Sequence, residues 1–219
     1  MTELAAQLLE SSQAPRIIQQ VQAILNEEQN RRRSFYEWMG NSKKAEFING
    51  EIIMHAPALH RHNAAVISLG TLLNTYVNTS NEGVVVIEKA LVELTRNSYE
   101  PDLCYFGLER AGGLTPELLY YPAPDLIVEV LSESTKKNDR NIKFEDYAAH
   151  GVEEYWIIDP TRQTVETFGI DADTKEYAAL GTFKVGQSVS SLVLPEFTIP
   201  VKAIFDSQAK GVALRALLA

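Results

Sequence analysis

Polar and apolar residues alternate on both sides of the pair Asn49-Gly50, within residues 44–54. A period of two is typical of half-buried β-strands, and Asn-Gly supplies the positive φ angles that a two-residue hairpin turn requires. With this pair in the turn, Ile48 pairs with Glu51, so that Glu46 and Glu51 share one face. The pattern therefore predicts a β-hairpin with two carboxylates on the same face.

Apolar residues recur at helical spacing in three other segments, residues 15–40, 62–78 and 132–151. Pro15 suits the first turn of a helix, and Ser132 begins a helix-start signal. We therefore predict a helical N-terminal extension over residues 1–40, followed by two further helices.

Short apolar runs bounded by turn residues predict strands over residues 84–94, 103–106, 124–131 and 154–159, and an antiparallel meander from residue 164 to residue 193. The chain of 219 residues is long enough for one well-buried core but short for two full domains. One main domain is therefore expected.

Composition places the chain among globular proteins, because 45% of its residues are hydrophobic and 22% are charged. No run approaches the roughly 18 apolar residues of a membrane span, and the N-terminus does not resemble a secretory signal. We therefore expect a cytoplasmic protein with no membrane partner. The net charge of −9 argues against nucleic-acid binding by bulk attraction. It does not exclude a nuclease, since a metal ion can supply local positive charge.

Two further features have ordinary explanations. Cys104 has no cysteine partner, so a buried apolar role is favoured over a reactive thiol. The basic run Asn30-Arg31-Arg32-Arg33 could contact phosphate, but a solvated helix face is the favoured interpretation.

Glu129 interrupts the apolar strand predicted over residues 124–131. A carboxylate buried in a strand is unfavourable unless it is paired with a cation or binds a metal ion. Asp102 begins the preceding strand, and the two acids would converge if the strands pair. Two carboxylates and water would then form the oxygen-rich site that Mg²⁺ prefers. The alternative is that the acids pair with a structural cation, such as Lys137 or Arg140.

Lys143 is the best candidate for the cation that assists phosphodiester cleavage by orienting water or neutralising phosphate charge. It lies four residues after Asp139 on the predicted helix, so the two side chains share a face. A surface ion pair between them is the alternative. Asp125 competes with Asp102, but it lies four residues from Glu129, roughly 13 Å along a strand. A shared metal ion is therefore not expected.

Three histidines, His55, His60 and His62, lie between the hairpin and the first helix of the main domain. They lack a thiolate or distant histidine partner set, so a zinc site is disfavoured. His62, close to the helix start, is instead expected to organise the site.

Four segments together resemble the Uma2 family of restriction endonucleases, within the PD-(D/E)XK nuclease superfamily: EFINGEIIMHAPALHRHN, EPDLCYF, APDLIVEVLSEST and DRNIKFEDYAAHGVEEYWIIDP. Their order, over roughly residues 35–170, is more specific than any one of them. The resemblance implies a restriction-endonuclease-like α/β core over residues 41–205, with a central mixed sheet flanked by helices. A C-terminal tail of residues 206–219 would follow.

The same resemblance implies roles for particular residues. Asp102 takes the Pro-Asp position and Glu129 the acidic position of the superfamily motif. The lysine two residues after the acid is absent, and Lys143 on the following helix takes its place. Glu51 resembles the additional acid that such nucleases contribute from an early element, with Glu46 as the alternative.

These roles imply an endonuclease that hydrolyses phosphodiester bonds of DNA with Mg²⁺, for which Mn²⁺ can substitute. A second hypothesis is a catalytically degenerate nuclease-fold protein that binds nucleic acid or has a regulatory role. A third is a structural interaction protein whose carboxylates pair with cations. RNA stays open as a substrate, and cutting both strands of a duplex would favour a homodimer.

Overall fold

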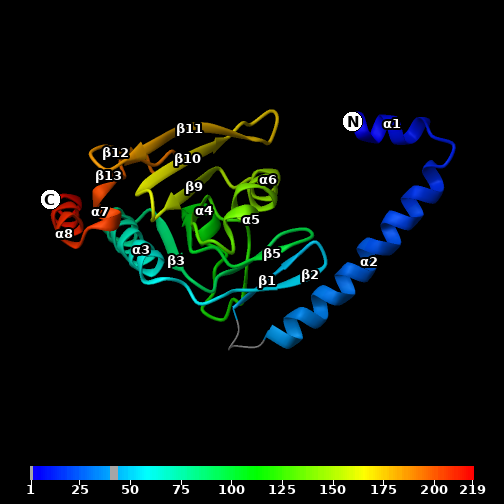
Figure 1. Ribbon diagram of the computed structural model, residues 1–219, viewed down its shortest axis with the longest axis horizontal. Helices are drawn as coiled ribbons and strands as arrows, with labels where there is room; N and C mark the ends of the chain where they lie inside the picture. The colour runs from blue at the N-terminus through cyan, green and yellow to red at the C-terminus, as the bar shows by residue number, and fades with distance from the viewer. Residues whose placement is uncertain (1, 40–43) are drawn as a thin grey trace.

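The computed structural model describes residues 2–39 and 44–219. Two helices, α1 (Glu3–Glu10) and α2 (Ala14–Met39), come first and extend away from the body of the molecule as an arm (Figure 1). Helix α2 confirms the helix predicted from residue 15. The expected boundary between extension and domain, at residues 40 and 41, lies outside the described residues.

A six-stranded sheet forms the centre of the body, in the order β11-β10-β9-β8-β6-β3. Strands β8 and β9 are parallel and the other neighbours are antiparallel, so the sheet is mixed, as expected. Its strands are β3 (Gly83–Ile87), β6 (Leu103–Gly107), β8 (Leu126–Val130), β9 (Glu154–Asp159), β10 (Thr164–Ile170) and β11 (Tyr177–Lys184).

A second sheet of five short strands packs against the first and contains the predicted hairpin, in the order β2-β1-β5-β4-β7. Ile48 pairs with Glu51, and Asn49 and Gly50 have φ angles of 50° and 84°, which confirms the turn. The strands are β1 (Ala45–Ile48), β2 (Glu51–Met54), β4 (Leu91–Glu93), β5 (Ser98–Tyr99) and β7 (Tyr120–Tyr121).

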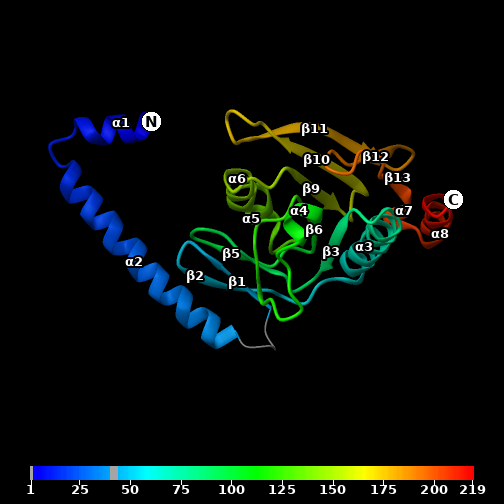
Figure 2. The ribbon, with the colours of Figure 1, turned by 180° about the vertical axis from the view of Figure 1, so that it is seen from behind.

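Helices lie on both sides of the central sheet (Figure 2). On one side are α3 (His60–Ser80), which confirms the second predicted helix, and the short helix α7 (Lys202–Phe205). On the other are α5 (Lys136–Arg140) and α6 (Ile142–Ala149). Alternation along β8 sends Val128 into the core beneath α3 and Ile127 into the core that joins the two sheets and α6. The remaining elements are α4 (Leu108–Ala111), β12 (Ser188–Ser190) and β13 (Thr198–Pro200).

Two predicted elements are divided in the structure. The strand expected over residues 84–94 becomes β3 and β4, which belong to different sheets, because Glu88 and Lys89 have φ angles of 57° and 53°. The helix expected over residues 132–151 becomes α5 and α6, since Asn141 leaves the helical conformation with φ −126° and ψ −91°.

The last residues form a packed helix, α8 (Ser207–Leu217), where a tail was expected. The Asp206 carboxylate caps it by accepting a hydrogen bond from the Ala209 amide at 2.7 Å. Ala213 is buried in the core beneath α3. The predicted domain limit at residue 205 stays a prediction. No described helix is long and apolar enough to span a membrane.

Arg32 corrects the interpretation of the basic run as a wholly solvated face. Its side chain is buried and donates hydrogen bonds to the carbonyl oxygens of Leu94, Thr95 and Asn97 at 2.8, 3.0 and 3.1 Å. Its two arginine neighbours are exposed. Arg32 thus anchors α2 to the loop between β4 and β5. The predicted burial of Cys104 is confirmed.

Candidate active site

Asp102 and Glu129 lie next to each other on the central sheet. Antiparallel pairing of Leu103 with Val128 places Asp102, immediately before β6, opposite Glu129 on β8. Asp102 Oδ2 accepts a hydrogen bond from the Val130 amide at 2.8 Å. Both acids are buried, at 5% and 4% exposure. The structure therefore brings together the two carboxylates that the sequence singled out.

Lys143 is at the centre of a buried group of charges. Its Nζ lies 2.8 Å from Glu46 Oε1, 2.9 Å from Glu129 Oε1 and 3.2 Å from Asp139 Oδ1. Tyr147 lies one turn further along α6, and its hydroxyl donates to the same Glu129 oxygen at 2.9 Å. The pair of Asp139 and Lys143 exists, but it is buried at 1% exposure rather than placed on the surface.

The carboxylates that share Lys143 differ in their electrostatic surroundings. Burial opposes ionisation of Glu46, but the charges of Lys143 and His55 lower its pKa to about 2. At Glu129, burial raises the pKa well above the ordinary value, and the neighbouring charges of Asp139 and Asp102 add to this effect. Lys143 therefore keeps Glu46 ionised, while burial favours the neutral form of Glu129.

A second set of donors approaches Asp102 from its other side. His62 Nε2 lies 3.2 Å from Asp102 Oδ1. One donor atom from each of His62, Glu88 and Asp102 lies within 4.8 Å of the others, a spacing that one metal ion can bridge. Burial opposes protonation of His62, yet the Asp102 carboxylate raises its pKa above the usual range. The Lys44 ammonium pairs with Glu88 at 2.7 Å and lies 3.9 Å from Asp102.

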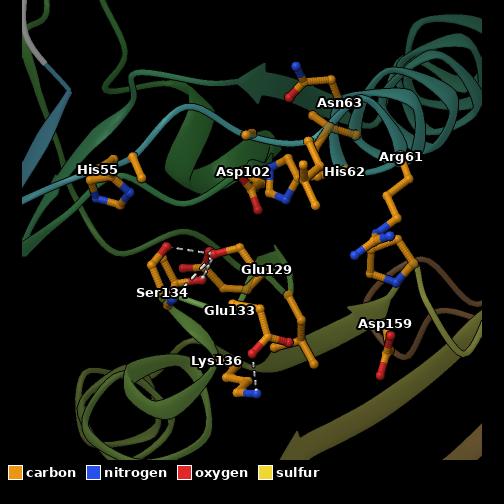
Figure 3. Close-up of a pocket in the computed structure, with 18 of the residues that line it drawn as sticks. His55, Arg61, His62, Asn63, Asp102, Glu129, Glu133, Ser134, Lys136 and Asp159 are labelled. Carbon is orange, nitrogen blue, oxygen red and sulfur yellow. Dashed lines mark hydrogen bonds and ion pairs between the residues drawn. The ribbon is translucent and has the colours of Figure 1, made fainter.

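These groups line a pocket of about 1230 Å³, and Figure 3 shows Asp102, His62 and Glu129 around it. Glu100 also lines the pocket, and its buried Oε2 has no hydrogen-bond partner among the described residues. Burial raises the pKa of Glu100 to about 7. Arg61 lies at the N-terminal end of α3 and extends its guanidinium toward the pocket (Figure 3).

The structure separates the two hairpin acids. Glu46 is buried against Lys143, whereas Glu51, at the turn, is exposed. Neither is among the residues that line the pocket. They share a face as expected, but Glu51 lies at the turn, opposite Ile48, whereas Glu46 lies further along the hairpin, opposite Ile53. Asp125, the other acid of a Pro-Asp pair, is bound by Arg110 at 2.9 Å and by the Gly107 amide at 2.6 Å.

Several residues of the site were not found by sequence reasoning. Lys44 could have been found, because strand alternation places it on the same face as Glu46. No sequence signal pointed to Glu88, since its position depends on a positive φ angle, which is uncommon for a non-glycine residue. Arg140, named in the alternative interpretation as a structural cation for the site carboxylates, pairs instead with Glu166 at 2.6 Å.

The family model of Uma2, described as "Putative restriction endonuclease", matches residues 32–202. The chain belongs to the Uma2 family. This Uma2 chain is 32% identical over 129 residues to "Uncharacterized protein sll1609" of Synechocystis sp. (strain ATCC 27184 / PCC 6803 / Kazusa), and the match spans 58% of this chain and 72% of that protein. The expected family is thus confirmed.

A solved structure confirms the mixed α/β fold of this Uma2 protein. A crystal structure described as a putative nuclease belonging to DUF820, from Anabaena variabilis ATCC 29413, matches 77% of this chain and 95% of that chain, with a TM-score of 0.65 and 21% identity. The type IIG restriction endonuclease BpuSI matches over 16% of its own chain, with a TM-score of 0.37 and 12% identity.

Proposed function

We propose that this protein is a metal-dependent endonuclease that hydrolyses DNA phosphodiester bonds in the pocket of Figure 3. The observation that carries the proposal is the pair of buried carboxylates, Asp102 and Glu129, on adjacent strands at the pocket. Membership of a family described as restriction endonucleases supports the reaction class.

The donor set fits a divalent cation of the Mg²⁺ or Mn²⁺ type. Asp102 and Glu129 would hold it, and His62 and Glu88 offer further donors next to Asp102. Carboxylate oxygens are the ligands that both ions prefer. Burial, and then the neighbouring acids, raise the pKa of Glu129, and a bound cation would favour its ionised form. When bound, such an ion lowers the pKa of water and polarises a phosphate oxygen.

The two lysines of the site have different roles in this proposal. Lys143, which is fully buried, fixes the Glu129 carboxylate through its 2.9 Å contact and balances part of the charge around it. Lys44 keeps 28% of its side chain exposed and lines the pocket. It therefore supplies positive charge beside Asp102 where a phosphate could approach.

Arg61 is the proposed contact to the DNA backbone. Its side chain is exposed at the pocket and forms no ion pair within the described part of the chain. Two other pocket cations are already paired, Lys136 with Glu133 at 2.7 Å and Arg140 with Glu166 at 2.6 Å. A free guanidinium can bind a phosphate through two hydrogen bonds.

Cleavage assays test the proposal. The protein is incubated with supercoiled, linear and single-stranded DNA and with RNA, with Mg²⁺, Mn²⁺ or chelator. We expect metal-dependent cutting of DNA, reduced at least ~100-fold by Asp102→Asn or Glu129→Gln because each removes a metal-binding charge. Asp173→Asn, at an exposed loop acid, is the matched control and keeps wild-type activity. The proposal fails if no DNA is cut with either ion, or if Asp102→Asn cuts as fast as the wild type.

One observation favours a second candidate, a nuclease fold that binds nucleic acid without cutting it. The Lys44 ammonium pairs with Glu88 near Asp102 and could take the place of a metal ion. Calorimetric titration with Mn²⁺ separates the two functions. Binding that is lost in Asp102→Asn supports the nuclease, whereas no binding by folded wild-type protein supports the degenerate site.

A further inference from the structure

One wall of the pocket is apolar although it borders the charged site. This apolar wall consists of Leu59, Ile67 and Ile87, which line the pocket and are 59%, 61% and 40% exposed. Aliphatic side chains that stay exposed together in a concave site commonly contact a ligand there. A metal ion and a phosphate bind to polar and charged groups, so the apolar wall indicates contact with a different part of the substrate.

The apolar wall adjoins the proposed metal donors. Helical spacing places Ile67 and Gly70 on one side of α3. A Cβ atom at Gly70 would lie 2.6 Å from Ile87 Cδ1, so Ile87 packs directly against this side of the helix. His62 lies on the adjoining side of the same helix, with its Nε2 3.2 Å from Asp102 Oδ1 (Figure 3). A group bound at Asp102 would therefore have the apolar wall next to it.

An amide group lies between the aliphatic side chains of this wall. Asn63 follows Leu59 by four residues and precedes Ile67 by four, so the three share one side of the helix start. Asn63 is exposed and lines the pocket, and its side chain forms no hydrogen bond with another described residue. An amide offers both donors and an acceptor, as the edge of a nucleobase does. Aliphatic surface and an amide together suit a base, which has apolar faces and a polar edge.

Positive charge in the pocket is mostly paired with carboxylates of the protein. Arg61 forms no ion pair within the described chain. The other lysines and arginines of the pocket lining are each paired: Lys44, Lys136, Arg140, Lys143 and Arg162. Proteins hold a regular duplex largely through phosphate contacts from such side chains. Beyond the proposed ion and Arg61, the pocket therefore offers more contacts to a base than to a duplex backbone.

We propose that the apolar wall and Asn63 bind the base of an unpaired nucleotide next to the scissile phosphate, so that the preferred substrate is single-stranded or locally unpaired DNA. This inference rests on the proposed function, because an ion at Asp102 would hold the phosphate and so bring the neighbouring base to α3. In a regular duplex that base is stacked and paired, and reaching the wall would require its extrusion. Leucine and isoleucine side chains contact base faces where bases are unstacked.

Cleavage of one sequence in three forms tests the substrate class: a single strand, a fully paired duplex, and a duplex with a central unpaired segment. With the full chain, one salt concentration and Mn²⁺, we expect kcat/KM to be roughly tenfold or more higher for the single strand than for the duplex, since no base has to be unpaired. Cuts in the third form should fall within the unpaired segment. A duplex cut as fast as the single strand overturns this inference but leaves the metal-dependent endonuclease standing.

Binding measured without cleavage separates this inference from the proposed function. Fluorescence anisotropy follows a labelled single strand and a labelled duplex, with Glu129→Gln protein and Mn²⁺, because this variant keeps the donors of His62, Glu88 and Asp102. We expect the single strand to bind roughly tenfold or more tightly than the duplex. Such a preference in a protein whose wild type cuts no DNA would support the base site and contradict the nuclease. Equal affinities for the two forms would overturn the base site.

A variant and an altered substrate test the contact itself. Ile67→Ser should lower kcat/KM on the single strand about fivefold, because apolar contact with the base is lost, and Ile67→Leu should restore it. Val212→Ser is the matched control, since Val212 is 60% exposed on another helix and does not line the pocket. An abasic nucleotide beside the cleaved phosphate should cause a similar loss, because the backbone is kept and the base is removed. Unchanged cutting of the abasic strand, or equal losses in Ile67→Ser and Val212→Ser, would overturn the proposal.

Discussion

At the scale of single residues, Lys143 connects three elements. Its ammonium contacts Glu46 on β1, Glu129 on β8 and Asp139 on α5, so one side chain joins both sheets and a helix. Burial lowers the pKa of a lysine, but these carboxylates raise that of Lys143 well above its ordinary value. The ammonium therefore stays charged, and the carboxylates depend on it.

Replacing this cation should be costly. Lys143→Met keeps the length of the side chain but leaves three buried carboxylates without their cation, so we expect a loss of about 3–5 kcal/mol in the free energy of unfolding. Urea unfolding at neutral pH measures it. Lys137→Met, at an exposed lysine on α5, should change stability by less than about 0.5 kcal/mol. Equal stabilities of the two variants would show that the charges around Lys143 are compensated elsewhere.

Glu46 should contribute to acid sensitivity. Its pKa falls from 4.5 to about 2 on folding, so its contribution is complete above pH 4.5 and is lost as the pH falls through about 2. The stability difference between wild type and Glu46→Gln should therefore shrink across this window. Unfolding titrations at several pH values measure it. A difference that stays constant down to the lowest pH would mean that Glu46 is not held ionised by Lys143 and His55.

Residue types and strand periodicity predicted part of the site. Glu129 was identified because a carboxylate in an apolar strand needs a partner, and Asp102 because the two strands were expected to pair. Periodicity could not choose between Glu46 and Glu51, which share a face. The contact with Lys143 decides, and this contact depends on how the second sheet packs, which short-range patterns do not encode.

At the scale of elements, the structure depends on the turns that separate strands and on the contacts that anchor helices. Apolar spacing predicted α2, α3 and the strands of the central sheet. It missed the break between β3 and β4, because Glu88 and Lys89 adopt positive φ angles without any glycine to signal them. It also missed the anchoring of α2, because Arg32 binds carbonyl groups of a loop that lies more than sixty residues away in the sequence.

Arg32→Met should loosen this anchor. Three carbonyl oxygens lose a charged donor, and we expect a loss on the order of 3 kcal/mol in unfolding free energy. Hydrogen exchange should show faster exchange in α2 and in residues 94–98 than in the central sheet. Arg33→Met is the matched control on the exposed side of the helix. Similar exchange in both variants would mean that the apolar contacts of Phe35 hold α2 without help from Arg32.

At the scale of the whole molecule, the site forms only when both sheets and their helices are packed together. Its acids come from both sheets, and its histidine comes from a helix on the opposite side of the central sheet from α6. The order of the four family motifs predicted this restriction-endonuclease-like body. The projecting arm, formed by α1 and α2, was predicted to be helical. No local sequence pattern predicted that it extends away from the body.

Metal binding should stabilise the whole molecule, because the proposed ligands come together only in the folded chain. At a hundredfold excess over Kd, a bound ion adds about 2.7 kcal/mol. Thermal unfolding with and without Mn²⁺ should show a rise of several degrees in Tm that Asp102→Asn abolishes. A smaller rise in Tm in both Glu129→Gln and His62→Ala would show that donors on both sides of Asp102 contribute to metal binding. An unchanged Tm in the wild type at millimolar Mn²⁺ would contradict the proposed site.

The backbone conformation of Glu88 lowers the stability of the protein, so selection for stability alone would act against the site. A non-glycine residue with positive φ costs roughly 1 kcal/mol or more, and Glu88 and Lys89 both have one. A random library selected only for heat tolerance should therefore accumulate glycine or asparagine at both positions. At Lys89, which is exposed, the change should be neutral for metal affinity. At Glu88 the substitution removes a donor beside Asp102. The most heat-tolerant variants would therefore include those that bind Mn²⁺ most weakly.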